Sequence, residues 1–321
     1  MDAPVVVATH GHCLDGCASA VLFTALHRAV VGGQARFVYF GQTYDPGKNG
    51  VDPRTFVGSS DSAILDYRYT AVDALGWYFD HHRTAFPSQA DSDHFAALEA
   101  RGRGFFDRDA GSCTILIDRV ARTRFGVDLS AHTELVAFAD MVDRAAFPTA
   151  EAAVDRSDPK MKLVSVLEQQ GDDRLLADLV QRLSTRSLGE VAADADLAAR
   201  AAPLEAAYAA QVARIRAREE RRGHVVYVDL LDQPIEVVAK FATYADAPDL
   251  PYSVVLTRTD RRCKISIGYN PWCPVARRHD IAAMCSAHGG GGHAVVGAIA
   301  LPPDPDRCRA LAATLVEELN R

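Results

Sequence analysis

Residues 5–20 read VVVATHGHCLDGCASA, and the fold is decided by this stretch. The apolar and mostly β-branched residues 4–9 predict a short buried strand. A polar cluster follows at residues 10–15, and from about residue 18 to residue 31 the pattern becomes that of a helix. The stretch therefore predicts a strand, a loop and a helix in that order.

Other short apolar segments repeat this arrangement. Each ends at polar residues, and they are residues 36–40, 62–65 and 77–79. Helical patterns occupy much of residues 110–184. Strands that alternate with helices predict an α/β fold with a parallel sheet covered by helices on both faces. Because ligands gather beyond the carboxyl ends of such strands, we expect three residues to converge there: His10, Asp66 and Asp80.

The second half of the chain differs in composition. Residues 188–221 are rich in Ala, Glu, Asp and Arg with almost no aromatics, which predicts a long, partly exposed helix. After Gly223 the patterns predict strands at 224–229, 252–258, 263–268 and 295–301, and helices at 234–245, 280–287 and from Pro305. We therefore predict a first domain at 1–187, a helical linker at 188–222, and a smaller α/β domain at 223–321.

Composition narrows the class of protein. A chain of 321 residues that is 48% hydrophobic and 24% charged can bury a large core and favours two domains. Residues 4–8 and 192–202 are too short or too interrupted by charge to cross a bilayer, so no membrane-spanning helix is expected. The first strand is not preceded by a secretory signal pattern, which makes the cytoplasm the expected compartment.

Cysteine usage and charge exclude further classes. The seven cysteines include no C-x-x-C pair, which argues against a disulfide framework and a structural zinc site. A formal net charge of -7 gives no global positive field. A nucleic-acid partner would therefore be short, or held by a local basic patch, and a long duplex is a poor match.

Carboxylates and imidazoles recur in four segments. They are residues 10–15, Asp66, the run Asp80-His81-His82, and Asp140 with Asp143. This mixture suits Mn²⁺, Fe²⁺ or Zn²⁺ better than Ca²⁺. Two metals sharing a carboxylate could activate water and stabilise the charge of a phosphoryl displacement. Taken singly, Asp66 is typical of a turn and the Asp140 pair of a solvated helix face, so the interpretation depends on all four segments.

A second cluster surrounds four consecutive glycines: Gly289, Gly290, Gly291 and Gly292, between His288 and His293. Such a run can expose backbone amides as an anion-binding concavity, but it is also typical of a flexible hairpin or a helix C-cap. Nearby cationic and aromatic side chains could contact phosphate or stack on a base: Lys264, Tyr269, Asn270, Trp272, Arg277 and Arg278. Trp272 equally suits a packing core.

Five segments resemble motifs of the DHH/DHHA1 phosphoesterases, in the order of that family. They are VVVATHGHCLDGCASA, AILDY, FDHHRTAF, FADMVDRAAFP and HGGGGHAVVGAIAL, and they span nearly the whole chain. The family includes oligoribonucleases, single-strand exonucleases and nucleotide phosphatases. The resemblance implies an N-terminal parallel-sheet DHH catalytic domain, a C-terminal DHHA1 substrate-binding domain, and an active site in the cleft between them.

The same resemblance implies a dinuclear metal centre. Its ligands would be His10, Asp15 and His81, with Asp66 as the bridge and Asp140, or alternatively Asp143, completing the set. The expected cofactor is two Mn²⁺ ions, with Fe²⁺, Co²⁺ or Zn²⁺ as alternatives. His82 would face the substrate phosphate and Asp80 would orient the imidazoles. The expected substrate contacts are Arg83, Gly289, Gly290, Gly291, Gly292, His293, Lys264 and Asn270.

The first motif departs from the family pattern. Cys13 stands where the family has its first Asp, and His10 lies one residue farther upstream than usual. Cys13 or His12 could supply the missing ligand, which would favour a softer metal such as Zn²⁺ or Fe²⁺. The alternatives are that this metal site is weak or empty, and that Cys13 is only a small buried residue.

We therefore expect a metal-dependent phosphodiesterase of the exonuclease type, acting on short single-stranded oligonucleotides or on nucleotides. One alternative is a nucleotide phosphomonoesterase acting on bisphosphorylated nucleosides or polyphosphate. Another is a nucleotide-binding protein with weak catalysis. No membrane partner is expected, and a homodimer remains an open alternative to a monomer.

Overall fold

The computed structural model describes residues 3–43, 50–235, 239 and 241–321, with only the backbone described at His293. The chain forms two compact units. The first contains Met1–Ala146 and Arg156–Leu204, and the second contains Phe147–Asp155 and Glu205–Arg321. The chain thus enters the second unit twice, a division that differs from the predicted limits at residues 187 and 222.

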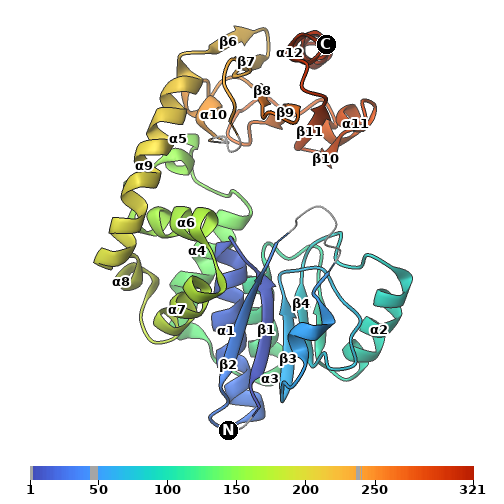
Figure 1. Ribbon diagram of the computed structural model, residues 1–321, viewed down its shortest axis with the longest axis vertical. Helices are drawn as coiled ribbons and strands as arrows, with labels where there is room; N and C mark the ends of the chain where they lie inside the picture. Colours follow the sequence, from blue (N-terminus) through green and yellow to red (C-terminus); the bar gives the residue numbers. More distant parts are fainter. Residues whose placement is uncertain (1–2, 44–49, 236–238, 240) are drawn as a thin grey trace. The chain divides into compact units, whose positions relative to one another are not determined.

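A five-stranded parallel sheet forms the centre of the first unit (Figure 1). Its order is β2-β1-β3-β4-β5, with β1 at Val5–His10, β2 at Phe37–Gln42, β3 at Asp61–Leu65, β4 at Trp77–Asp80 and β5 at Gly104–Phe106. In β1, Val7 lies opposite Tyr39 of β2 and Ala63 of β3. The chain passes from β1 to one neighbour and then to the other, so the sheet has its topological switch point at β1, where ligands bind in such folds.

Helices cover both faces of this sheet. The helices of the first unit are α1 (Leu14–Val31), η1 (Pro53–Phe56), α2 (Gln89–Ala100), α3 (Cys113–Phe125), η2 (Ser130–His132), α4 (Thr133–Asp143), α6 (Pro159–Gln170), α7 (Asp173–Leu183), α8 (Leu188–Ala192) and the start of α9 (Ala195–Arg216). Phe23 of α1 makes ring contacts with Trp77 and Phe79. Between these two, Tyr78 points to the other face and contacts Phe95 of α2. This alternation confirms the predicted parallel sheet with two covered faces.

Helix α1 is the one described helix long and apolar enough to cross a membrane by length and composition, with a mean hydropathy of 1.3. Within the first unit, 72% of that window is buried. A helix that is covered on most sides is apolar all round because it has little polar face to present to water. The apolar composition of α1 is therefore explained by its place in the core.

A six-stranded mixed sheet forms the centre of the second unit. Its order is β10-β11-β9-β8-β7-β6, with β6 at Glu219–Arg222, β7 at Val225–Asp229, β8 at Tyr252–Arg258, β9 at Cys263–Tyr269, β10 at Gly291–His293 and β11 at Val296–Leu301. Helices α11 (Ile281–Ser286) and α12 (Pro305–Leu319) pack on one core, while α10 (Ala242–Asp246), the end of α9 and Val154 of α5 (Ala150–Val154) pack on another.

The predicted α/β class with a smaller second sheet is confirmed, and several details differ. Residues 188–221 form two helices and the start of β6 rather than one helix. The short α8 begins at a capping box of Ser187 and Glu190 and ends at Ala192, before α9 begins at Ala195. Part of the predicted helix 234–245 lies outside the described residues, and its described end is α10. Neither α2 nor β5 was predicted.

Candidate metal centre

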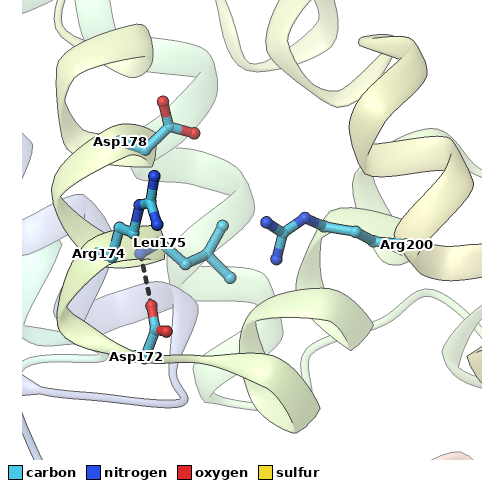
Figure 2. Close-up of a pocket in the computed structure, with 5 residues that line it drawn as sticks. All are labelled: Asp172, Arg174, Leu175, Asp178 and Arg200. Carbon is cyan, nitrogen blue, oxygen red and sulfur yellow. Dashed lines mark hydrogen bonds between the residues drawn. The ribbon is translucent and has the colours of Figure 1, made fainter.

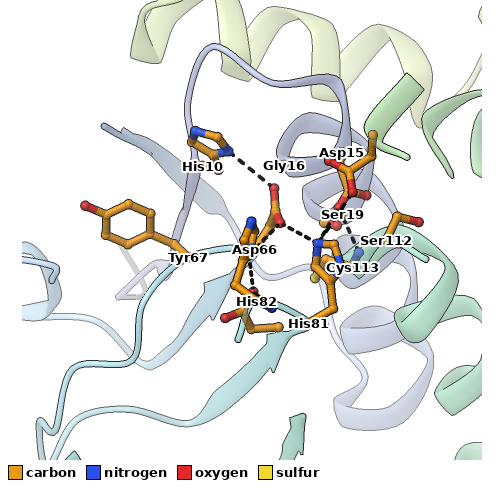
Figure 3. A network of polar contacts seen from close by, with 12 residues as sticks. His10, Asp15, Gly16, Ser19, Asp66, Tyr67, His81, His82, Ser112 and Cys113 are labelled. Atoms are coloured by element: carbon orange, nitrogen blue, oxygen red, sulfur yellow. Dashed lines mark hydrogen bonds and ion pairs between the residues drawn. The ribbon is translucent and has the colours of Figure 1, made fainter. Parts of the chain in front are cut away.

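The predicted side chains gather at the carboxyl edge of the first sheet (Figure 3). His10 is the last residue of β1, and Asp66 directly follows β3. Asp80 ends β4, and His81 and His82 come next. Figure 3 shows the three imidazoles arranged around the Asp66 carboxylate. Parallel strands end at one edge of a sheet, so residues distant in the sequence meet here.

Close packing of the first motif brings Asp15 to this edge. Gly16 lies so near β1 that a Cβ atom there would be 2.1 Å from the carbonyl oxygen of His10. Thr9 Oγ1 also donates a hydrogen bond of 2.8 Å to the Gly16 carbonyl. Asp66 adopts a positive φ of 52°, a region in which Asp is more tolerated than most residues. Only glycine at position 16 lets α1 begin this close to the strand.

The Asp66 carboxylate lies between two groups of side chains. On one side, His81 Nε2 is 3.6 Å from Asp66 Oδ1, 3.6 Å from Asp143 Oδ2 and 3.8 Å from Asp15 Oδ2. On the other side, His10 Nδ1 is 3.6 Å from Asp66 Oδ2. One Asp66 oxygen therefore faces each group, which is the position of a carboxylate that bridges two cations.

Hydrogen bonds fix the two histidines of the DHH run in different ways. His82 Nδ1 donates to Asp80 Oδ1 at 2.8 Å, and Asp80 Oδ2 accepts from Tyr78 Oη at 2.9 Å. His81 Nδ1 donates to the carbonyl oxygen of Ala110 at 3.3 Å. A neutral His81 held by this bond would present its Nε2 lone pair to a cation, the arrangement of a metal-binding histidine. Burial alone would lower the pKa of His81, but the contact with Asp66 and the charges of the surrounding carboxylates raise it to about 9 when no cation is bound.

The carboxylates are crowded enough to repel one another. Burial, and then the charges of Asp66 and Asp143, raise the pKa of Asp15 well above its usual range. Burial and the charge of Asp66 likewise raise the pKa of Asp143 to about 6. Burial alone would raise the pKa of Asp66, but the adjacent His10 and His81 outweigh it and lower the pKa to about 2. A cation among these groups would relieve the repulsion.

Buried atoms without partners also fit a cation. Asp66 is 1% exposed, and neither of its oxygens accepts a hydrogen bond from a described residue. His81 Nε2 is likewise buried without a hydrogen-bond partner among the described residues. Such atoms are costly unless something binds them. Three residue groups place one ligand atom each within 4.8 Å of the others: His10 with Cys13 and Asp66, Asp66 with His81 and His82, and Asp15 with His81 and Asp143.

The structure distinguishes the two candidates on α4. Asp143 is the one that lies beside His81, whereas Asp140 forms an ion pair of 3.3 Å with Arg144. Asp140 Oδ1 is buried against Gly111 without a hydrogen bond to a described residue. The sequence-based preference for Asp140 is therefore replaced by a proposal that Asp143 is the ligand.

The sequence did not predict the backbone amides that hold the Asp15 carboxylate. Asp15 accepts hydrogen bonds of 2.7 Å from Cys113 N and 2.9 Å from Thr114 N, at the N-terminus of α3. A carboxylate is stabilised at such a helix end, which offers unpaired amides and a positive dipole. The available signal was Ser112, whose side chain caps α3 by accepting from Ile115 N.

The expected substrate contacts differ in their exposure to solvent. Arg83 is exposed, and Lys264 is exposed on β9. Asn270 is fully buried, and its Nδ2 donates to the carbonyl oxygens of Pro248 and Leu250 while its Oδ1 accepts from Trp272 N. The amide of Asn270 thus holds a turn together, and we no longer assign it to substrate.

Two of the four glycines are required by a hairpin. A Cβ atom at Gly290 would lie 2.3 Å from the Ala298 carbonyl oxygen, and one at Gly292 would lie 2.2 Å from that of Val296. Gly291 and Gly292 belong to β10, which pairs with β11. The predicted hairpin interpretation therefore accounts for part of the run. The side chain of His293 lies outside the described part of the chain, and its assignment stays a prediction.

Two pockets open in the first unit. One, of about 450 Å³, is lined by Asp172, Arg174, Leu175, Asp178 and Arg200, none of which belongs to the three ligand groups (Figure 2). The other, of about 830 Å³, includes Gln42, Tyr69, Ser88 and Asp91 in its lining. None of its lining residues belongs to the ligand groups, but Gln42 is the register partner of His10.

Comparison with solved structures identifies the fold. The fold is that of DHH-domain proteins, as the motifs predicted. The most similar structures include a pGpG-specific phosphodiesterase, PggH from Vibrio cholerae, which is 17% identical with a TM-score of 0.69 over 98% of this chain and 99% of that one.

Two further structures share the fold. A DHH domain from a member of a family of ribosomal proteins is 12% identical with a TM-score of 0.60, over 99% of this chain and 88% of that one. The exonuclease RecJ bound to manganese is 13% identical with a TM-score of 0.57, over 98% of this chain and 90% of that one. No protein-family model and no curated protein matches the sequence.

Proposed function

We propose that the chain is a metal-dependent phosphoesterase that hydrolyses phosphoester bonds of short oligonucleotides or nucleotides. The supporting observation is the Asp66 carboxylate, which is buried, lacks hydrogen-bond partners among the described residues, and lies between two groups of ligand atoms. Carboxylates shared in this way are typical of two-metal sites that act on phosphates. The manganese in the RecJ structure favours Mn²⁺ as a first choice of cofactor.

The ligand set would include five carboxylate and imidazole side chains. We assign His10, Asp15, Asp66, His81 and Asp143 to two divalent cations, with Asp66 shared. Bound there, the cations would activate a water molecule and neutralise charge on the phosphoryl oxygens. The N-terminus of α3 holds Asp15 in place, and the Ala110 carbonyl holds the His81 ring.

Proton transfer is assigned to His82. Its Nδ1–H is held by Asp80, which in turn accepts from Tyr78, so the ring is fixed in one orientation. We propose that Nε2, the other ring nitrogen, donates a proton to the leaving oxygen of the substrate. The buried Asp80 acts through His82 and does not contact the substrate.

Part of the substrate would occupy the pocket that Gln42, the register partner of His10, helps to line. Its volume of about 830 Å³ lies in the range of small-molecule sites, which are usually 300–1,000 Å³. The PggH similarity makes linear dinucleotides the first substrates to test. Arg83, Lys264 and the glycines Gly289, Gly290, Gly291 and Gly292 remain proposed contacts, and the expected cleft between the units stays a prediction.

A hydrolysis assay tests the proposal. Purified chain with Mn²⁺ should cleave a linear dinucleotide to mononucleotides. Asp66→Asn and His81→Ala should each lower turnover more than about 100-fold, since even partners of metal ligands are worth about 10- to 100-fold. Asp143→Asn should cost more than Asp140→Asn, because only Asp143 lies beside His81.

The same assay separates the alternatives. Preferential release of phosphate from a 3′,5′-bisphosphorylated nucleoside or from polyphosphate would favour the phosphomonoesterase. Tight nucleotide binding by calorimetry, without turnover in Mn²⁺, Mg²⁺, Co²⁺, Zn²⁺ or Fe²⁺, would favour the nucleotide-binding alternative. Full Mn²⁺-dependent activity in folded Asp66→Asn protein would contradict the proposed mechanism.

A further inference from the structure

We propose that the two metal sites are chemically unlike, and that Cys13 binds the metal of one of them through its sulfur atom. This inference rests on the metal centre of the proposed function and deepens it by naming the kind of metal that each site takes. The starting observation is the composition of two ligand groups: His10, Cys13 and Asp66 in one, and Asp15, His81 and Asp143 in the other.

Cys13 stands at the start of α1 without a regular side-chain capping bond. Cys13 is the N-cap residue of α1, with extended backbone angles of φ -144° and ψ 136°. At an N-cap the side chain normally accepts a hydrogen bond from the first turn, which is why Ser, Thr, Asp and Asn are preferred there. Cys13 makes no such capping bond. Its sulfur instead lies within 4.8 Å of ligand atoms of His10 and Asp66.

His12, the other residue that could supply the missing ligand, is engaged elsewhere. Its Nδ1 donates to the carbonyl oxygen of Glu168 at 3.1 Å, and its backbone has a φ of 37°. His12 belongs to none of the three ligand groups found among the described residues. The structure therefore favours Cys13 over His12 as the third donor beside His10 and Asp66.

A second observation is independent of the cysteine. Asp66 Oδ2, which faces His10, is buried and lacks a hydrogen-bond partner among the described residues. A metal held by His10 and Cys13 would satisfy this oxygen. On binding, the Cys13 thiol would lose its proton to solvent, because thiolate rather than thiol is the metal ligand.

The two donor sets select different metals. The first offers one sulfur, one nitrogen and one carboxylate, and thiolate ligands favour Zn²⁺ and Fe²⁺ over Mn²⁺. The second offers two carboxylates and one imidazole, which suit Mn²⁺. We infer that the native centre holds Zn²⁺ or Fe²⁺ in the Cys13 site together with Mn²⁺ in the Asp15 site.

Cobalt spectroscopy tests the sulfur ligand directly. Metal-free full-length protein titrated with Co²⁺ should develop the near-ultraviolet band of thiolate-to-cobalt charge transfer. Cys13→Ser should lose this band and bind Zn²⁺ more than about tenfold more weakly, since a lost ligand should cost at least as much as a lost partner of a ligand. Cys17→Ala is the matched control, because Cys17 lies on the same helix, fully buried and outside the ligand groups. It should keep the band.

Thiol labelling gives a second readout that does not depend on the variants. Cys13 is the only one of the seven cysteines that is partly exposed. Although burial raises the pKa of the Cys13 thiol and slows its reaction, a thiol-specific chromophoric reagent should react with this thiol before the other six in the native metal-free protein, and Zn²⁺ should protect it. Peptide mapping should identify it as Cys13.

Metal content completes the test. Untagged protein purified without chelators should contain both Mn²⁺ and either Zn²⁺ or Fe²⁺, and Cys13→Asp should shift toward Mn²⁺ alone. Absence of the charge-transfer band in Co²⁺-saturated wild-type protein would overturn the inference, as would unchanged Zn²⁺ affinity in folded Cys13→Ser. Hydrolysis without the band would leave the proposed function standing and remove this inference. The band without hydrolysis of any tested phosphoester would do the reverse.

Discussion

At Gly16, the absence of a side chain decides whether the ligand cluster can form. A Cβ atom there would lie 2.1 Å from the His10 carbonyl oxygen, which belongs to backbone and cannot easily move. We expect Gly16→Ala to lower the free energy of unfolding by about 1–3 kcal/mol, the usual cost of overpacking. It should also weaken metal binding, because a shift of Gly16 would move the proposed ligand Asp15, which directly precedes it. Urea unfolding and Mn²⁺ titration measure the two effects.

Gly189→Ala is the control for this prediction. A Cβ atom at Gly189 meets nothing nearer than Glu134 Oε1 at 3.7 Å, so alanine should be neutral or stabilise by up to about 1 kcal/mol. Equal stability and equal Mn²⁺ affinity in the two variants would show that the contact between α1 and β1 is not what positions the ligands.

Individual residues were predictable where a strand end or a motif placed them. His10, Asp66 and His81 meet because parallel strands end together, and that rule can be applied to a sequence. The sequence-based preference for Asp140 over Asp143 had no local basis, since residues three apart share a helix face. The structure separates them by the Arg144 ion pair of Asp140 and the His81 contact of Asp143. Asn270 was assigned to substrate because the sequence does not show that its amide forms hydrogen bonds within a turn.

Among the elements, the edge strand β6 carries a pH-dependent weakness. Burial, and then the charge of Asp246, raise the pKa of Glu219 from 4.5 to about 7. The folded state then holds a proton that the unfolded state releases, so the contribution of Glu219 to stability is complete below about pH 4.5 and lost as pH rises through about 7. Glu219→Gln should therefore raise the melting temperature at pH 8 and change it little at pH 4.

A neighbouring residue controls for loss of charge in the same strand. Glu220 is exposed on β6 and pairs with Arg222. Thermal unfolding of Glu219→Gln and Glu220→Gln at both pH values separates burial of a carboxylate from a simple change in net charge. An equal gain at pH 4 and pH 8 in Glu219→Gln would show that its titration does not affect stability.

Elements were predicted well where burial was continuous. The strands β1, β3 and β4 are buried along most of their length, so their sequences are uninterrupted apolar runs. Helix α2 was missed because only Phe95 and Leu98 of its residues are buried. Strand β5 spans only Gly104–Phe106, which is too short to show a period. Strand β2 was predicted although its residues are only partly buried, because its aromatic and β-branched residues are typical of a strand.

At the scale of the whole molecule, composition showed two units but not the path of the chain between them. Residues 147–155 belong to the second unit although they lie between segments of the first. The third boundary, after Leu204, falls within α9 one residue past Pro203, which lacks the amide that would continue the helix hydrogen bonding. Contacts between distant segments decide such a crossing, and no local pattern records them.

One tryptophan tests how segment 147–155 is held. Trp272 Nε1 donates a hydrogen bond of 2.7 Å to the Phe147 carbonyl oxygen, while its ring packs against Phe241 and Tyr244. Trp272→Phe would keep much of the ring packing and leave that carbonyl without this donor. We expect a loss of about 1 kcal/mol, and faster hydrogen exchange in α5, which follows Phe147 in the same segment.

The other tryptophan of the chain provides the matched control. Trp77 Nε1 donates to Asp61 Oδ2 at 3.1 Å within the first unit, so Trp77→Phe removes the same kind of bond elsewhere. It should leave exchange in α5 unchanged, because Trp77 and α5 belong to different units. Mn²⁺ affinity should survive in Trp272→Phe, since all the proposed ligands, Cys13 included, lie in the first unit. Equal exchange in α5 for wild type and Trp272→Phe would mean that contacts other than this hydrogen bond hold the segment.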